Sequence, residues 1–298
     1  MRRFIWLVRR EIWENKSIWV APLIVLGCLL LLVLTGHAHL GPVGSVDSAA
    51  PFGAMPADKQ LRLLLIVYSG LALVVYMVMG VIAFFYSLDS LYADRRDRSV
   101  LFWKSLPLSD AETVLSKFTV AAVVIPLVAL VGALLAQLLV AGGGAATLEM
   151  AGVPGNIMWQ PEALLGGAAV AILWCITAIL WYAPVISYLM LASAWAPKGP
   201  FLWAVLPPIA ISVLERVVVG TGHVGEFLGG RLSGLYRLLD SGKQVDEHGS
   251  VTLKLSQLDL MGSLRDFYGS ADLWLGLVAA GLLLAAAMWL RRYRDETS

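Results

Sequence analysis

Six long apolar stretches, almost free of charged side chains, determine the fold class of this chain. Each has about 20 residues or more, enough for a helix to cross roughly 30 Å of hydrocarbon. Of the 298 residues, 59% are hydrophobic and only 14% are charged, which is too apolar for a soluble domain. We therefore predict an all-α polytopic membrane protein with a single transmembrane domain over residues 1–298. Its membrane-crossing helices are expected at residues 18–36, 63–88, 118–141, 163–190, 201–220 and 273–290.

The first 17 residues have a different character, because charged and apolar side chains alternate there at near-helical spacing. Trp6 and Trp13 are interleaved with arginines at positions 2, 3, 9 and 10. An amphipathic helix of this kind lies in the membrane interface, with tryptophans at the headgroups and arginines toward anionic lipid. We predict such an interfacial helix over residues 1–17.

A polar segment, residues 89–117, interrupts the apolar pattern between the second and third predicted spans. It contains five consecutive charges of mixed sign, from Asp94 to Arg98. Such a run is too costly to place in the bilayer core, so it must lie in water beside the membrane. Apolar residues follow at positions 100–103.

The same segment also contains signals for a helix to stop and a new one to start. Pro107 halts any preceding helix. Ser109 and Glu112 then form an S-x-x-E capping box, which begins a helix leading directly into the third span. The sequence thus predicts two helices separated by a break, attached to two membrane helices and facing solution.

This pattern resembles the permease subunits of the ABC-2 class of ABC transporters. The matching residues are Asp94 to Arg98, Leu101 to Pro107 and Ser109 to Lys117, together with Arg9 to Trp13 near the N-terminus. The resemblance implies an ABC-2 (type V exporter-like) permease fold, with six membrane helices, an N-terminal elbow helix and a cytoplasmic coupling helix between helices 2 and 3. We call residues 89–117 the coupling segment.

The resemblance also implies a function. A permease of this class forms the substrate path of an ATP-driven exporter in the bacterial cytoplasmic (inner) membrane, as a homodimer or heterodimer. It docks on a separate cytoplasmic ABC ATPase, which holds the ATP and Mg²⁺, and it has no catalytic site, cofactor or metal of its own. The residues expected to contact the ATPase are Asp94, Arg95, Arg96, Asp97, Arg98, Phe102, Trp103 and Lys104. In the elbow helix Arg9, Arg10 and Glu11 are candidates for the same contact, although a plain lipid anchor explains them equally well.

The distribution of basic residues predicts the orientation independently of the resemblance. With both termini in the cytoplasm, the segments outside the spans that are predicted on the cytoplasmic side hold 14 Lys or Arg in 63 residues. Those predicted on the outer side hold 7 in 100. Cytoplasmic loops are the ones enriched in Lys and Arg. The coupling segment is therefore expected in the cytoplasm, where an ATPase could reach it.

The sequence also bears on the source of energy. It has no G-x-x-x-x-G-K-[ST] phosphate loop, so the chain does not hydrolyse ATP by that chemistry. Ion coupling normally uses an ionisable side chain within the spans, and only Glu215 and Arg216 qualify. The four histidines form no metal-protease motif, and no basic tract suggests nucleic-acid binding. Two alternatives stay open: a membrane structural or assembly protein that recruits a non-ATPase cytoplasmic partner, and an ion-driven transporter.

Aromatic and polar side chains within the spans are candidates for a substrate path. They are Tyr76, Gln137, Trp174, Trp181 and Tyr182. Aromatic belts and packing within the helix bundle explain them at least as well. Two further expectations are a kink at Pro126 in the third span and a short amphipathic helix on the outer surface within residues 221–271.

Overall fold

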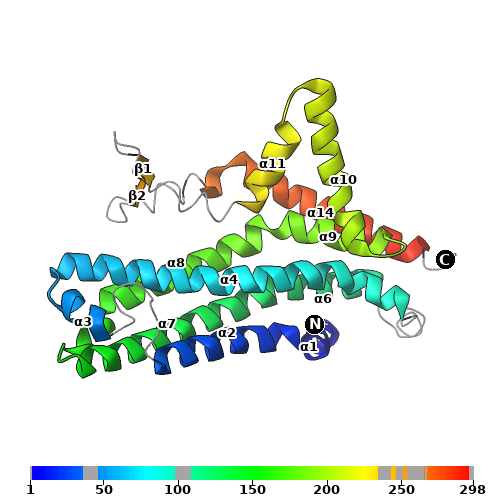
Figure 1. The fold of residues 1–298 in the computed structure, drawn as a ribbon. Helices are drawn as coiled ribbons and strands as arrows, with labels where there is room; N and C mark the ends of the chain where they lie inside the picture. Colours follow the sequence, from blue (N-terminus) through cyan, green and yellow to red (C-terminus); the bar gives the residue numbers. More distant parts are fainter. Residues whose placement is uncertain are drawn as a thin grey trace. The chain divides into compact units, whose positions relative to one another are not determined.

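The computed structural model describes residues 2–35, 46–97, 109–233, 243–245, 251–253, 265 and 267–294. Nearly all of these residues are helical, and the described strands are two short ones paired antiparallel, β1 (Lys243–Val245) and β2 (Val251–Leu253) (Figure 1). The α-helices are α1 (Arg2–Glu14), α2 (Ser17–Leu34), α3 (Val46–Gly53), α4 (Ala57–Arg96), α6 (Asp110–Thr119), α7 (Ile125–Met150), α8 (Pro161–Trp181), α9 (Ala183–Trp195), α10 (Pro200–Leu214), α11 (His223–Leu232) and α14 (Ala271–Arg294).

Six helices are long and apolar enough to cross a membrane, as the sequence predicts. They are Ser17–Leu34, Ala57–Arg96, Asp110–Met150, Gly155–Trp181, Pro200–Val219 and Ala271–Tyr293. Their lengths and composition confirm the all-α polytopic class. The amphipathic helix expected at the N-terminus is also present, as α1.

Three of the expected spans differ from the observed helices, and one of these, expected at residues 118–141, continues as α7 to Met150. α4 extends from Ala57 to Arg96, well beyond the expected residues 63–88. The stretch 163–190, expected as one helix, is divided at Tyr182 into α8 and α9. The reason for the division is Pro184 in the first turn of α9, since a proline interrupts the backbone hydrogen bonding of a continuous helix.

The expected irregularity near Pro126 is a turn of π-helix. α6 continues through this turn, η2 (Val120–Val124), into α7, which has Pro126 in its first turn. Proline lacks the N–H that an α-helix would use there, so the backbone leaves regular α geometry just before it.

The chain divides into two compact units. One unit contains residues 15–82 and 124–176, and the other contains residues 1–14, 83–123 and 177–298. We call them the apolar unit and the polar unit and describe each by itself.

The apolar unit has a well-packed hydrophobic core. Its fully buried side chains include Phe52, Leu64, Tyr68, Leu148 and Met158. The polar atoms that enter this core find backbone partners: Tyr68 Oη donates to the carbonyl of Met158 at 2.7 Å. α2 and α3 both pack on α7, and the 3₁₀ turn η3 (Gly155–Trp159) folds back on it.

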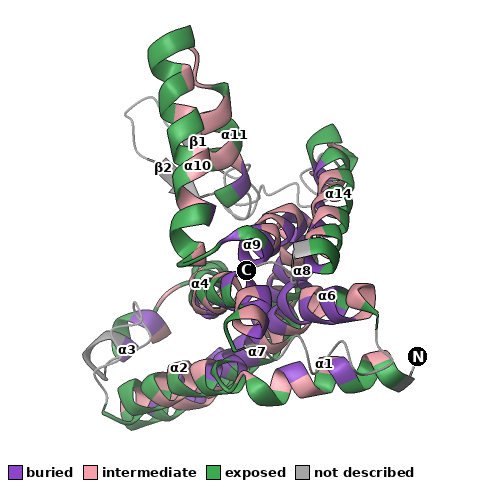
Figure 2. Ribbon diagram, turned by 90° about the vertical axis from the view of Figure 1, so that its right-hand side faces the viewer, coloured by how far each residue is buried: buried purple, intermediate pink, exposed green. Residues whose placement is uncertain are grey.

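The polar unit is built around α9 and α14, which pack along one another. α6 contacts α1, α9 and α14, and α10 and α11 lie side by side as a hairpin (Figure 1). α10 is apolar and largely exposed (Figure 2). Only 6% of the membrane-crossing stretch within Pro200–Val219 is buried in the protein. Because such a surface is not stable in water, lipid or another protein must cover it.

The outer amphipathic helix expected within residues 221–271 corresponds in part to α11. Phe227 and Leu232 lie on it and are exposed. The remaining apolar positions assigned to it, Leu235 to Leu239, fall outside the described residues.

Candidate functional site

The coupling segment is described at both of its ends. Its first part is the last turns of α4, which reach Arg96, and its last part is α6, which begins at Asp110. The capping box is confirmed: the backbone N–H of Glu112 donates to Ser109 Oγ at 3.1 Å, and the Ser109 N–H donates to Glu112 Oε2 at 3.0 Å. Four of the residues expected to contact an ATPase, Arg98, Phe102, Trp103 and Lys104, lie outside the described residues.

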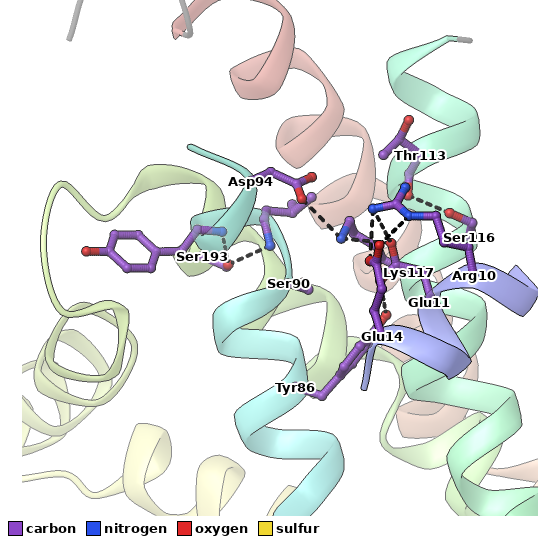
Figure 3. Close-up of polar contacts among 12 residues, drawn as sticks. Arg10, Glu11, Glu14, Tyr86, Ser90, Asp94, Thr113, Ser116, Lys117 and Ser193 are labelled. Carbon is purple, nitrogen blue, oxygen red and sulfur yellow. Dashed lines mark hydrogen bonds and ion pairs between the residues drawn. The ribbon is translucent and has the colours of Figure 1, made fainter. Parts of the chain in front are cut away.

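Five charged side chains join both ends of the segment to the rest of the polar unit. They alternate in sign, and we call them the charge cluster: Glu11, Lys117, Asp94, Arg291 and Asp110 (part of it is shown in Figure 3). Each ion pair joins two different helices. The cluster therefore connects α1, α4, α6 and α14.

Lys117 and Arg291 each bridge two acids. Lys117 Nζ lies 3.0 Å from Glu11 Oε1 and 3.4 Å from Asp94 Oδ1. Arg291 Nη1 donates to Asp94 Oδ2 at 2.9 Å, and its Nε lies 3.3 Å from Asp110 Oδ1. Asp94 consequently has one cation on each carboxylate oxygen.

Four of the five members of the charge cluster are buried and Asp110 is partly exposed, so the buried part is energetically expensive and sensitive to change. Glu11, Asp94, Lys117 and Arg291 are between 3% and 6% exposed. Removing such charges from water costs several kcal/mol per ion, and only good pairing offsets that cost. Deleting one partner of a buried pair typically destabilises a protein by about 3–5 kcal/mol, because the other charge is left behind. The geometry is therefore well suited to holding these helices together as one body.

Glu11 takes part in this cluster as the anchor of the elbow helix. It lies one turn after Leu7, and both residues are buried on the same face of α1. Besides Lys117, its carboxylate accepts a hydrogen bond from Tyr86 Oη at 3.1 Å (Figure 3). The neighbouring Arg10 pairs with Glu14 at 2.7 Å. Glu11, expected as a candidate contact for a partner, thus has an intramolecular role in the structure.

The outer face of α1 carries aromatic and basic side chains. Trp6 and Trp13 are both exposed. The guanidinium of Arg9 lies 5.2 Å from the ring centre of Trp6 and 4.6 Å from that of Trp13. This is the composition expected of a helix at the membrane interface.

Arg95 has a structural position as well. Its Nη2 donates to the carbonyls of Ser193 and Ala196, at 2.6 and 2.9 Å. These carbonyls belong to the C-terminal end of α9, where a helix has no internal donors left. Ser193 Oγ in turn accepts hydrogen bonds from the backbone N–H groups of Leu91 and Tyr92. The end of α4 is therefore attached to α9 as well as to the charge cluster.

Arg96 and Asp97 differ from the two residues before them, because their side chains are 54% and 59% exposed. They pair with each other at 3.0 Å, and Arg96 also lies 3.9 Å from Asp89. Among the expected ATPase contacts that the structure describes, Asp94 and Arg95 thus point into the protein and Arg96 and Asp97 point to its surface.

The candidate substrate-path residues fall into two groups, one in each unit. In the apolar unit, Tyr76 Oη donates to the carbonyl of Ala171 at 3.0 Å, and its ring lies edge-on to Trp174, with centroids 6.2 Å apart. Gln137 Nε2 donates to the carbonyl of Leu164 at 2.8 Å. In this group each polar atom serves to join one helix to another.

The second group is in the polar unit, where it joins the α8–α9 break to α11. Trp181 Nε1 donates to the carbonyl of Arg231 at 2.9 Å, and Tyr182 Oη donates to that of Leu232 at 3.2 Å. The Arg231 guanidinium lies 4.3 Å from the centre of the Trp181 ring and bonds the carbonyl of Asp272. These contacts favour packing, the alternative that the sequence left open.

Glu215, the candidate for ion coupling, acts as a cap for α11. Its carboxylate accepts from Thr221 Oγ1 at 2.8 Å and from the backbone N–H groups of His223 and Val224 at 2.9 and 2.8 Å. Those N–H groups are among the donors that the start of a helix leaves free. The structure gives this acid a local role at the turn between α10 and α11.

Sequence reasoning missed Arg291, Lys117 and Ser193 as members of the site. Arg291 follows the last apolar stretch together with Arg292 and Arg294, a pattern that by itself indicates only a stop-transfer signal. A signal for Lys117 exists, because Asp110, Val114 and Lys117 recur at positions i, i+4 and i+7 on one face of a short helix. A cation on the same face as a buried valine points to an internal partner.

Comparison with known families gives one match. Residues 61–182 match the model described as ABC-2 family transporter protein. This confirms the resemblance. The matched stretch runs from α4 through α6 and α7 to the start of the α8–α9 break, so it contains the whole coupling segment. No curated protein and no solved structure matches the chain significantly.

Proposed function

We propose that this chain is the permease subunit of an ATP-driven ABC exporter, and that the exposed end of α4 contacts a separate cytoplasmic ATPase. The observation that carries the function is the family match over residues 61–182. The given residues contain no phosphate loop, which agrees with an ATP site held outside them. ATP and Mg²⁺ would be held by that partner.

Of the described residues that the sequence predicts to contact the ATPase, we retain Arg96 and Asp97. Arg96 and Asp97 offer exposed charges of both signs at the end of a helix that is itself continuous with a membrane-crossing segment. Asp94 and Arg95, just before them, attach this helix end to α6, α9 and α14. A displacement of Arg96 or Asp97 by the ATPase would therefore also displace α6, α9 and α14.

The proposed assembly places two permease chains, identical or related, with two ATPase subunits in a bacterial cytoplasmic membrane. Both termini would lie in the cytoplasm, since the excess of Lys and Arg is on that side. The exposed apolar surface of α10 is available for lipid or for the second permease chain. Nucleotide-driven closure of the ATPases would then shift the coupling segments and open the path outward.

Of the two alternatives, the ion-driven transporter is the less supported one, because its main candidate residue already has local partners. Glu215 is engaged by three hydrogen bonds within its own turn. An assembly protein that recruits a non-ATPase partner would use the same exposed charges, so it is distinguished by the identity of the partner.

The test is co-purification with a Walker-type ABC ATPase of the same organism, with any such ATPase encoded in a neighbouring reading frame tried first. We expect the two proteins to form a stable complex in detergent or nanodiscs, and the permease to raise the ATP hydrolysis rate of the ATPase. The matched variants are Arg96→Glu, expected to abolish that stimulation, and Lys59→Glu, an exposed cation at the opposite end of α4, expected to preserve it. Failure of the wild-type chain to bind any such ATPase would overturn the proposal.

A further inference from the structure

The last membrane-crossing helix, α14, is connected to the coupling segment through one side chain. Arg291 lies in the final turns of α14 and is 6% exposed. Through two different nitrogens it reaches Asp94 at the end of α4 and Asp110 at the start of α6. These two acids flank the part of the segment that would meet the ATPase.

We propose that Arg291 is a positioning residue for energy coupling: it holds α14 to both ends of the coupling segment, so that α14 moves together with α4 and α6 when the ATPases close. This inference rests on the proposed function. It adds α14 to the elements that the ATPase moves directly. Arg291 on this helix is 197 positions away from Asp94 in the sequence.

The environment of Arg291 distinguishes it from a general stop-transfer arginine. A stop-transfer signal needs only positive charge at the membrane surface, and such side chains normally remain in water. Arg292, the next residue, is of that kind, because it is exposed and lies over the ring of Tyr293. Arg291 is instead enclosed, with a carboxylate at each of two nitrogen positions.

Because of the surrounding contacts, a movement in which α14, α4 and α6 stay together costs less free energy than one that separates them. Separating α14 from α4 would break a buried ion pair and leave charges without their partners, and separating it from α6 would break the pair of Arg291 with the partly exposed Asp110. The same helix packs along α9, and α9 is attached to α4 through Ser193 and Arg95. Two independent links therefore join α14 to the end of α4, one ionic and direct, the other through α9.

The cluster also allows a variant that removes the link without leaving a new unpaired charge. Arg291→Met alone would leave Asp94 and Asp110 facing the gap. Combined with Asp110→Asn, it leaves the alternating series Glu11, Lys117 and Asp94, with the same net charge of one negative as the original five groups. Removing both partners of a pair costs much less stability than removing one.

The experiment uses the permease–ATPase complex in lipid nanodiscs. The variants are Arg291→Met/Asp110→Asn, Arg291→Lys as a conservative replacement that keeps one cation, and Arg292→Met as the matched exposed control. Three quantities are measured: permease-stimulated ATP hydrolysis, the thermal unfolding midpoint, and the distance between spin labels at Leu115→Cys on α6 and Trp289→Cys on α14. Both labelled positions are exposed, and the labels are placed in a Cys28→Ser/Cys175→Ala background.

We expect the label distance of the otherwise wild-type chain to be the same in the nucleotide-free and vanadate-trapped complexes. In the double variant it should broaden and change on trapping, and stimulated hydrolysis should fall at least about fivefold, the lower end of typical coupling between sites. Arg291→Lys should restore part of the stimulation, and Arg292→Met should behave as wild type. The unfolding midpoint of the double variant should fall by less than the loss of a whole buried pair would cause, because Asp94 keeps Lys117, and measuring hydrolysis well below that midpoint separates coupling from folding.

Two kinds of failure are distinguishable. A double variant that retains full stimulation and an unchanged, narrow distance distribution would overturn the role of Arg291 and leave the proposed function intact. A wild-type permease that neither binds nor stimulates the ATPase would overturn the proposed function. In that case the label distances in the permease alone still report whether Arg291 holds α14 to α6.

Discussion

The two units stabilise their helix contacts in different ways. In the apolar unit, Tyr68, Tyr76 and Gln137 each donate one neutral hydrogen bond to a backbone carbonyl of another helix. In the polar unit, ionised side chains from four helices share partners in one cluster. A neutral bond of the first kind contributes about 1 kcal/mol and can be lost singly, whereas buried charges that share partners are lost together. The comparison teaches that the ionic contacts of the polar unit depend on one another, whereas the neutral hydrogen bonds of the apolar unit can be lost one at a time.

The largest effect is expected from Lys117→Met. This change leaves Glu11 and Asp94 buried without the cation between them, so we expect a loss of about 3–5 kcal/mol in unfolding free energy. Thermal unfolding in detergent measures it, with the exposed Lys198→Met as control. A midpoint equal to that of the control would show that the cluster does not hold the polar unit together.

The next comparison separates two adjacent arginines of the coupling segment. Arg95→Met removes two hydrogen bonds from a charged group, each worth about 1.5–3 kcal/mol, and should lower the unfolding midpoint. Arg96→Met removes an exposed charge and should leave that midpoint unchanged, while it slows association with the ATPase and alters its salt dependence. Unfolding scans and binding kinetics at two salt concentrations test both. The division between anchored and exposed residues is refuted if the two variants behave alike.

A tyrosine in each unit sharpens the contrast between charged and neutral bonds. Tyr86→Phe removes a hydrogen bond to the Glu11 carboxylate and should cost about 1.5–3 kcal/mol. Tyr68→Phe removes one to the Met158 carbonyl and should cost about 0.5–1.5 kcal/mol. The two variants have the same change in volume, so the difference between their unfolding midpoints reports the charge of the acceptor. Equal losses would count against the distinction.

The smallest effect concerns the start of α6. Ser109→Ala removes the side-chain half of the capping box and should cost about 1 kcal/mol. Hydrogen exchange of the amides in the first turn of α6 should accelerate, and Ser109→Asp, another good cap, should restore protection. Unchanged exchange in the alanine variant would mean that the charge cluster alone fixes this helix end.

Much of the fold could be predicted from the sequence because membrane helices leave a strong local signal. Charge-free stretches of sufficient length identify the six apolar helices, and the S-x-x-E pattern identifies the start of α6. The expected membrane span ends at residue 88 because charged residues follow it, but the helix itself continues to Arg96. Helices continue into water where side chains such as Asp94 and Arg95 find partners there.

The candidate site was predicted only in part, and the reason is distance along the chain. The charges of the coupling segment were identified by composition, but their separation into anchored and exposed residues depends on contacts from α1, α9 and α14. Asp94 and Arg291 are 197 positions apart, and no local pattern links them. The role of Ser193 likewise cannot be predicted from the sequence, because it depends on the contact of this serine with the end of α4.

Few residues of the same chain pack around α10, and this affects how the helix is oriented in the membrane. Where lipid covers this helix, its tilt follows the surrounding bilayer, whose thickness need not match its apolar length. Glu215 fastens α11 to the end of this helix, so α11 must follow any such tilt. Lipid acyl-chain length thereby becomes a physical control over the position of the α10–α11 hairpin.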